Sequence, residues 1–219
     1  PTGRIVTLSS AHVEAADIAA VDAASCLILS DEQTLLEQLK TEHPAAAQRA
    51  FEAPGEPVRA RLPRQIRAFD NGIGGYMSHG AEYSIDMAEG TPRPWCNLLV
   101  NERFGSIVSA AGGGYSWVNN SRTSRLTPFR NDPLFDIPGE GILVRNDRTG
   151  EVFGLAANLC ASGAYRTTHG IGYTVFERHG GVMAQALCFT DCELPARATL
   201  LTLENRTKRE DTYSVFCFA

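Results

Sequence analysis

From Ile66 to the end of the chain, short apolar runs are separated by Gly, Pro, Asn and Asp, and this punctuation limits the fold more than any other feature. Apolar and polar residues alternate at 82–87 and 103–108, as in strands that bury one face. No helical period is present in this region. Because two packed sheets bury both sets of apolar faces, the sequence predicts a mainly β fold, an antiparallel β-sandwich.

A hairpin is predicted at 141–155, where a turn rich in Asn, Asp and Gly joins two apolar runs. Further strands are expected downstream, at 172–178, 182–189, 197–204 and 212–219.

The first part of the chain has a different pattern. Strand-like and helix-like runs alternate over residues 1–42, which predicts a small α/β appendage that is too short to enclose its own core. Residues 43–65 contain four prolines, which favours a linker. The predicted organisation is therefore an appendage at 1–42, a Pro-rich linker at 43–65 and the β-sandwich at 66–219.

Charge and hydropathy exclude two classes of partner. The formal net charge of -5 and the scattered Arg residues give no basic surface for nucleic acid. No run approaches the roughly 20 apolar residues that cross a bilayer, and the first residues do not form a signal peptide. Because the chain begins at Pro1 and its last residues form a strand-like run, we expect a segment cut from a longer polypeptide.

The six cysteines lie mostly in apolar runs, without CxxC pairs or His at metal spacing. We therefore expect buried free thiols in a reducing compartment, with the segment in the cytoplasm. No metal or other cofactor is expected.

The strongest local signal for function spans residues 110–133, where a run of glycines is followed by aromatic, amide and guanidinium side chains. Aromatic faces pack against the C–H surface of a sugar, and Asn, Asp and Arg bond its hydroxyls, so a sugar-contacting loop is one interpretation. The alternative is a structural corner of the sandwich, with Trp117 and Phe129 in the core and Arg paired with Asp.

Other motifs carry less functional information. Residues 69–76 are rich in glycine but lack the Lys and Ser or Thr of a phosphate-binding loop, so a turn into the first strand is expected. His169 and His179 have no nucleophile or further ligand at suitable spacing, which favours structural roles. Nothing in the sequence selects a pair of catalytic carboxylates, and most are expected to be solvated or paired with Arg: Glu82, Asp86, Asp132, Asp136 and Glu140.

Five motifs occur together in the order found in one enzyme family: Thr91–Asn97, Gly112–Trp117, Asn120–Arg122, Leu126–Pro133 and His169–Tyr173. Over residues 66–219 the chain resembles the family 94 glycoside phosphorylases. The Asn131-Asp132-Pro133 element and the entry at 69–75 are more similar to the phosphorylase-type region of cyclic β-1,2-glucan synthases, or to β-1,2-oligoglucan phosphorylases, than to cellobiose phosphorylase.

The resemblance implies a galactose-mutarotase-like super-sandwich that packs against an (α/α)6 barrel, in which an Asp acts as general acid while phosphate attacks the anomeric carbon. The barrel is not in this sequence, so no catalytic residue is assigned. The expected partners are a β-glucan or glucooligosaccharide, the barrel of the same polypeptide and a second copy of the chain. The candidates for sugar contact, placed in the region that resembles the family's sugar-proximal loop, are Trp117, Asn120, Arg122, Phe129, Arg130, Asn131 and Asp132. Phe129 departs from the family pattern, since related enzymes often have Trp at this position.

Two hypotheses of different classes follow. In the first, the chain is a noncatalytic sandwich domain of a β-glucan-processing enzyme, which helps to bind glucan and to shape the active site of the barrel. The parent protein is then a glycosyltransferase or glycoside phosphorylase, expected to be anchored in the bacterial inner membrane. In the second, the domain serves only packing or oligomerisation. A third idea, an independent hydrolase, lacks a nucleophile elbow and a defensible acid pair.

Overall fold

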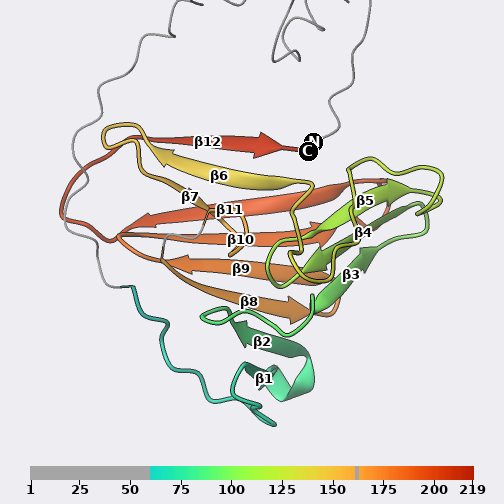
Figure 1. Ribbon diagram of the computed structural model, residues 1–219, viewed down its shortest axis with the longest axis horizontal. Coiled ribbons are helices and arrows are strands. Elements are labelled where there is room, and N and C mark those ends of the chain that lie inside the picture. Colours follow the sequence, from blue (N-terminus) through green and yellow to red (C-terminus); the bar gives the residue numbers. More distant parts are fainter. Residues whose placement is uncertain (1–59, 161–162) are drawn as a thin grey trace, which may run out of the picture. The chain divides into compact units, whose positions relative to one another are not determined.

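The computed structural model describes residues 60–160 and 163–219, which form an all-β body without an α-helix (Figure 1). One short 3-10 helix, Ser78–Gly80, follows the first strand. The described strands are β1 (Gly74–Met77), β2 (Glu82–Asp86), β3 (Cys96–Val100), β4 (Phe104–Ser109), β5 (Gly114–Val118), β6 (Gly141–Asn146), β7 (Val152–Gly154), β8 (Ala164–Gly170), β9 (Tyr173–His179), β10 (Val182–Thr190), β11 (Arg197–Asn205) and β12 (Tyr213–Phe218).

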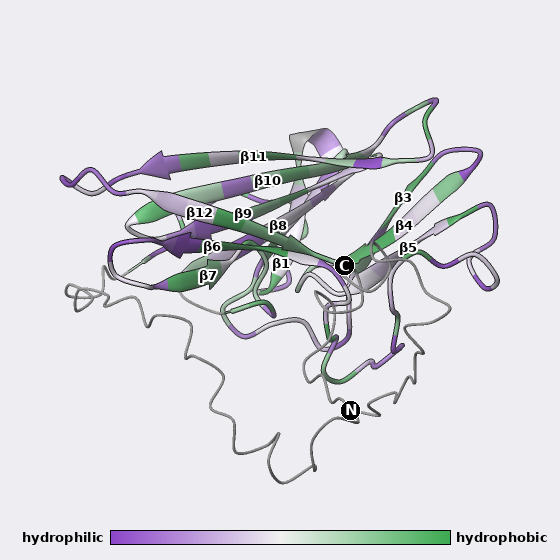
Figure 2. Cartoon of the chain, turned by 90° about the horizontal axis from the view of Figure 1, so that it is seen from above, coloured by the Kyte–Doolittle hydropathy of each residue, from purple (hydrophilic) through white to green (hydrophobic). Residues whose placement is uncertain are grey.

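The strands form three antiparallel sheets. The largest has the order β1-β2-β8-β9-β10-β11, and the two smaller ones are β12-β6-β7 and β3-β4-β5. Figure 2 shows the β12-β6-β7 sheet layered on the six-stranded sheet, with β3-β4-β5 at one end. The predicted mainly β, antiparallel sandwich is confirmed, and every strand expected from 82 onward is present.

The main core lies between the six-stranded sheet and β12-β6-β7. It forms because buried and more exposed residues alternate strictly along the strands that face it. Along β10, Val182, Ala184, Ala186 and Cys188 are buried while the intervening residues are more exposed. Val144 of β6 is fully buried in the same cluster. A second cluster joins β2, β8 and the turn after β4, and it contains Ile85, Met87, Ala110, Ala111 and Tyr165.

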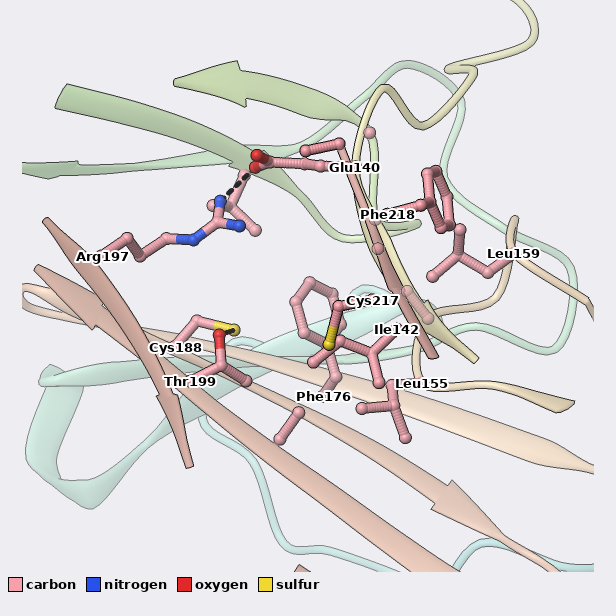
Figure 3. A pocket seen from close by; sticks show the side chains of 17 residues that line it. Glu140, Ile142, Leu155, Leu159, Phe176, Cys188, Arg197, Thr199, Cys217 and Phe218 are labelled. Carbon is pink, nitrogen blue, oxygen red and sulfur yellow. Dashed lines mark hydrogen bonds and ion pairs between the residues drawn. The ribbon is translucent and has the colours of Figure 1, made fainter. Parts of the chain in front are cut away.

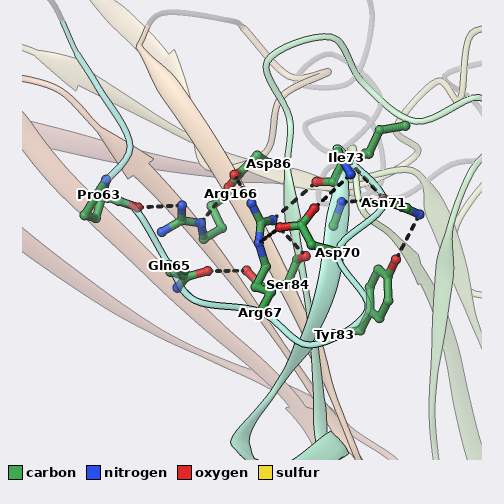
Figure 4. Close-up of polar contacts among 12 residues, drawn as sticks. Pro63, Gln65, Arg67, Asp70, Asn71, Ile73, Tyr83, Ser84, Asp86 and Arg166 are labelled. Atoms are coloured by element: carbon green, nitrogen blue, oxygen red, sulfur yellow. Dashed lines mark hydrogen bonds and ion pairs between the residues drawn. The ribbon is translucent and has the colours of Figure 1, made fainter.

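A pair of arginines fastens the entry segment to the six-stranded sheet (Figure 4). Asp86 on β2 receives Arg67 Nη2 and Arg166 Nε, each at 2.7 Å. Arg166 lies on β8, is buried, and also donates to the carbonyl of Pro63 at 2.8 Å. One carboxylate thus holds two guanidinium groups and fixes the segment before β1.

The N-terminal predictions lie almost entirely outside the described residues. The appendage at 1–42 and the linker up to residue 59 are not described, so the domain boundaries stay a prediction. Residues 60–65 have no regular structure, and Gln65 accepts a hydrogen bond from Ser84 at 2.7 Å. In the described part of the chain, no helix is long and apolar enough to span a membrane.

The prediction of buried cysteines is wrong for most of those described. All five thiols in the described residues are free, but only Cys188 is buried, whereas Cys96, Cys160, Cys192 and Cys217 are exposed. Cys96 and Cys217 belong to edge strands, which pair on one side only among the strands that the structure describes. A cysteine in an apolar run is therefore not necessarily buried when that run forms an edge strand. Cys26 lies outside the described residues.

Candidate functional site

The outer face of the β3-β4-β5 sheet carries a continuous group of apolar side chains. The strand register places Leu98, Ile107 and Tyr115 opposite one another. The neighbouring row of the same face brings Gly105 opposite Trp117. Because directly opposed residues in antiparallel strands share a face, these side chains form one surface.

Trp117 contributes the largest side chain to this surface. Its indole lies flat across Gly105, since a Cβ at Gly105 would stand 2.2 Å from Cζ2 and 2.3 Å from Cε2 of the ring. Trp117 is half-buried, so part of the ring stays accessible. The sequence interpretation placed Trp117 in a loop, but the structure places it on strand β5.

Three rings form a row, which we call the aromatic row: Trp117, Tyr115 and Phe129. Tyr115 and Phe129 stack with centroids 4.3 Å apart, and Tyr115 and Trp117 are 5.1 Å apart. The guanidinium of Arg125 lies over the Tyr115 ring at 5.2 Å, which covers that ring. Phe129 and Trp117 therefore flank a buried Tyr115.

A groove of about 500 Å³ runs beside Phe129. Its floor comes from Leu98 and Ile107 of the sheet, and its rim comes from the segment 129–137. Pockets of a few hundred Å³ are the usual size of small-molecule sites. The principal lining residues are Cys96, Asn97, Leu98, Ile107, Phe129, Arg130, Asn131, Asp132 and Asp136.

Arg130 and Asn131 supply unused polar groups at this rim. Both are exposed, and within the described part of the chain their side chains make no hydrogen bond or ion pair. Asn131 has φ 51°, a left-handed conformation that Asn tolerates better than most residues. Guanidinium and amide groups can bond hydroxyls from a ligand without first leaving a protein partner.

Asp132 holds the shape of the rim. Its Oδ1 accepts from the amides of Leu134 at 2.9 Å and Phe135 at 3.1 Å, which closes an Asx turn. Asn158 then donates from Nδ2 to the carbonyls of Phe135 at 3.1 Å and Asp136 at 3.2 Å. These bonds connect the rim to the segment of the same chain that contains Asn158. Asp132 therefore positions the rim in addition to lining the groove.

Asp136 lies at the end of the groove, against the turn between β4 and β5. Its Oδ2 accepts from Ser109 Oγ at 2.5 Å, and a Cβ at Gly113 would stand 2.0 Å from its Oδ1. Burial raises the pKa of the Asp136 carboxyl, the Ser109 hydrogen bond opposes this, and the charge of Asp132 adds to the rise. Although Cys96 as a residue is exposed, its thiol is partly withdrawn from water, and this desolvation, followed by the charge of Asp136, raises the pKa of the thiol.

The seven residues singled out in the sequence are only partly brought together. Phe129, Arg130, Asn131 and Asp132 line the groove, and Trp117 lies at the far end of the aromatic row. Asn120 and Arg122 do not line it. The Asn120 Oδ1 accepts from the amides of Arg122 and Thr123, which makes it a turn residue.

Sequence reasoning missed the floor of the groove, Leu98 and Ile107, which only strand pairing identifies. It listed Asp136 among the carboxylates but did not place it at the groove.

The other histidine and carboxylate side chains described next are bonded to residues within the fold. His169 lies between Thr174 Oγ1 at 3.0 Å and the Trp95 carbonyl at 3.1 Å, and burial lowers its pKa. Glu82 accepts from the Tyr173 hydroxyl, and Glu140 pairs with Arg197. No group of three or more His, Cys, Asp or Glu in the described part of the chain is arranged to hold a metal ion.

Comparison with known proteins identifies the family. Residues 81–219 match the model of the glycosyl hydrolase 94 supersandwich domain, which is more than half of the chain. The chain belongs to this family. The resemblance of the ordered motifs to family 94 enzymes is thereby confirmed, and it includes all residues of the groove and the aromatic row.

The relatives of this supersandwich domain are carbohydrate-active enzymes. The cyclic beta-(1,2)-glucan synthase NdvB of Rhizobium meliloti is 38% identical over 156 residues, which is 69% of this chain and 6% of that protein. The N,N'-diacetylchitobiose phosphorylase of Vibrio proteolyticus is 30% identical over 63% of this chain and 18% of its own length. The solabiose phosphorylase of Paenibacillus borealis is 30% identical over 67% of this chain and 20% of its own length.

The chain therefore spans only a small fraction of these relatives. It is a domain of the kind found in glucan synthases and disaccharide phosphorylases, and so a domain of a carbohydrate-processing enzyme.

Proposed function

We propose that this supersandwich domain is the noncatalytic part of a β-glucan-processing enzyme of the cyclic β-1,2-glucan synthase or β-1,2-oligoglucan phosphorylase type. Its groove contacts the glucan and helps to shape the active site of an (α/α)6 barrel elsewhere in the enzyme. The synthase likeness, at 38% identity, supports the glucan as ligand.

One observation carries the proposal: Phe129, the half-buried end of the aromatic row, lies beside two exposed polar side chains that make no hydrogen bond or ion pair in the described part of the chain. Phe129 offers an apolar ring for the C–H face of a sugar, while Arg130 and Asn131 offer donors for its hydroxyls. In the described residues these two polar side chains make no hydrogen bond or ion pair that would have to be broken. A groove of about 500 Å³ has room for one or two sugar rings.

A second candidate is a packing or oligomerisation surface without sugar contact. It is favoured by the exposure of Leu98 and Val100, 53% and 50%, on the outer face of β3. Exposed aliphatic side chains beside a groove are also typical of protein contact surfaces.

The experiment is a titration of the chain with β-1,2-glucooligosaccharides, followed by amide chemical shifts. We expect saturable shifts at Phe129–Asp132, and an affinity about 5-fold weaker in Arg130→Ala, from the loss of roughly 1 kcal/mol in hydrogen bonding. Arg122→Ala is the matched control, because Arg122 is exposed but lies outside the groove.

Equal affinities of the two variants would place the sugar elsewhere. No shift in the folded chain at millimolar sugar would favour the packing surface.

We also propose that the segment lies in the cytoplasm and that the parent enzyme is anchored in the inner membrane. The support is the family resemblance together with the thiols, all free in the described residues. Alkaline phosphatase fused after the segment should be inactive in cells, and an active fusion would exclude a cytoplasmic position.

A further inference from the structure

A second hollow, of about 770 Å³, adjoins the rim of the groove. Residues 88–94 form one of its walls, and residues 133–136, which belong to the rim, form another. Pro94, Pro133 and Asp136 line both the groove and this second hollow. The two spaces therefore meet at these three residues, and we call them together the two-part cleft.

The wall at 88–94 is held by the fold at both ends. Just before it, the amide of Met87 donates to the carbonyl of Tyr165 at 2.9 Å. Just after it, the carbonyl of Trp95 accepts from the amide of Ala110 at 2.8 Å. Two prolines within the wall fix their own φ angles, which removes backbone freedom that a ligand would otherwise have to restrict. This wall is therefore preformed.

The wall at 133–136 carries an accessible aromatic ring. Phe135 lines the second hollow and is 70% exposed. Its amide donates to Asp132 Oδ1, and its carbonyl accepts from Asn158 Nδ2, each at 3.1 Å. The backbone that carries this ring is thus fixed, in the same rim that presents Phe129 to the groove. Each half of the cleft therefore offers one ring for the C–H face of a sugar.

Both halves of the cleft also present both signs of charge. In the second hollow, Glu89 and Arg93 are exposed, and among the residues that the structure describes neither side chain makes a hydrogen bond or ion pair. In the groove, Arg130 and Asp132 supply the same two groups. An anion would meet a carboxylate in each half, and a cation would meet a guanidinium. A neutral ligand rich in hydroxyls can bond to both, so the charges favour a saccharide.

We propose that the two-part cleft binds one neutral oligosaccharide chain, which crosses the rim from the groove into the second hollow. This inference rests on the proposed sugar contact of the groove and adds the length of the ligand. The second hollow has room for about two more sugar rings, in addition to the roughly one or two of the groove, so a chain of about four fills the cleft. A disaccharide in the groove leaves the second hollow empty.

The test is calorimetric titration of the 219-residue chain, together with amide chemical shifts, using the β-1,2-linked glucose disaccharide and hexasaccharide. We expect one hexasaccharide per chain, bound at least about tenfold more tightly than the disaccharide, because the additional sugars bond in the second hollow. The disaccharide should shift the amides of residues 129–132. The hexasaccharide should shift these and the amides of Glu89, Arg93 and Phe135, with one common saturation curve.

Arg93→Ala and Phe135→Ala separate the two halves of the cleft. Each should weaken hexasaccharide binding about fivefold and leave the disaccharide affinity of the groove unchanged. Because both side chains are exposed, the variants should unfold at the same urea concentration as the wild type. Arg122→Ala is the matched control, since Arg122 is exposed but lines neither space, and it should bind both sugars as the wild type does.

The outcomes distinguish this inference from the proposed function. Equal affinities for the two sugars, or undiminished hexasaccharide affinity in both variants, would overturn the two-part cleft and leave the sugar contact of the groove in place. Two hexasaccharides per chain, or different saturation curves for the two halves, would also overturn it, because the halves would then be independent sites. Absence of any shift at 129–132 with either sugar would refute the proposed function of the groove and, with it, this inference.

Discussion

The contact between Gly105 and Trp117 allows a sharp test of the outer sheet face. In Gly105→Ala, the new methyl carbon would lie 2.2 and 2.3 Å from two carbons of the indole. Carbon atoms in contact are normally about 3.5–4.0 Å apart. The ring must therefore move outward by more than about 1 Å, and it cannot do so without loosening its contact with Tyr115, now at 5.1 Å.

The expected cost follows from this displacement. Inserting a methyl group into a packed site costs about 1–3 kcal/mol. Replacing glycine restricts the unfolded chain and returns roughly 0.4–1 kcal/mol. We therefore expect Gly105→Ala to lower the free energy of unfolding by about 1–2 kcal/mol, in a protein that keeps its fold.

Urea unfolding of four proteins measures the effect: wild type, Gly105→Ala, Trp117→Ala and the double variant. Without the indole the new methyl group has no ring to clash with. In the Trp117→Ala background, Gly105→Ala should therefore lower the free energy of unfolding by less than about 0.5 kcal/mol. The difference between the two backgrounds isolates the contact. An equal cost in both, or no cost in the wild-type background, would refute the flat placement of the ring.

Two further predictions concern the interior. Asp86→Asn removes the carboxylate shared by Arg67 and the buried Arg166, and should lower the free energy of unfolding in urea by about 3 kcal/mol. The control is Asp70→Asn, which removes a more exposed partner of Arg67 and should cost less than about 1 kcal/mol. Similar losses in the two variants would refute the special role of Asp86. Burial lowers the pKa of His169 below its ordinary value near 6.5. The contribution of His169 to the free energy of unfolding should therefore be complete above about pH 6.5 and fall as the pH drops below it, because the unfolded chain takes up the proton first. In His169→Gln, the free energy of unfolding should change less steeply with pH over this range. An unchanged pH dependence would exclude a contribution from His169.

Local patterns predicted most strands but missed β3, β5 and β8. The run at 182–189 alternates strictly and corresponds to β10, Val182–Thr190. By contrast, Gly114 was interpreted as part of a loop but begins β5. A Cβ there would stand 1.9 Å from the carbonyl of Ile107, and φ is 132°, so glycine is needed where β5 approaches β4. Glycine marks close approach of strands as well as turns, and sequence alone does not separate the two.

The candidate site shows the same limit. Phe129–Asp132 line one groove because they are contiguous in the chain, and a motif is enough to find them. Leu98 and Ile107 join them only through the pairing of β3 with β4, and no local signal fixes that register. Arg122 has the right chemistry for sugar contact but lies outside the groove. Residue type identified the chemistry, and the fold selected which residues can act together.

A polar network lies behind the sheet that carries the groove. Ser116 Oγ donates to Ser106 Oγ at 3.2 Å, and Ser106 receives Arg197 Nη1 at 2.9 Å. Arg197 on β11 in turn pairs with Glu140 (Figure 3). The network therefore joins the β3-β4-β5 sheet, whose other face carries the groove, to the six-stranded sheet.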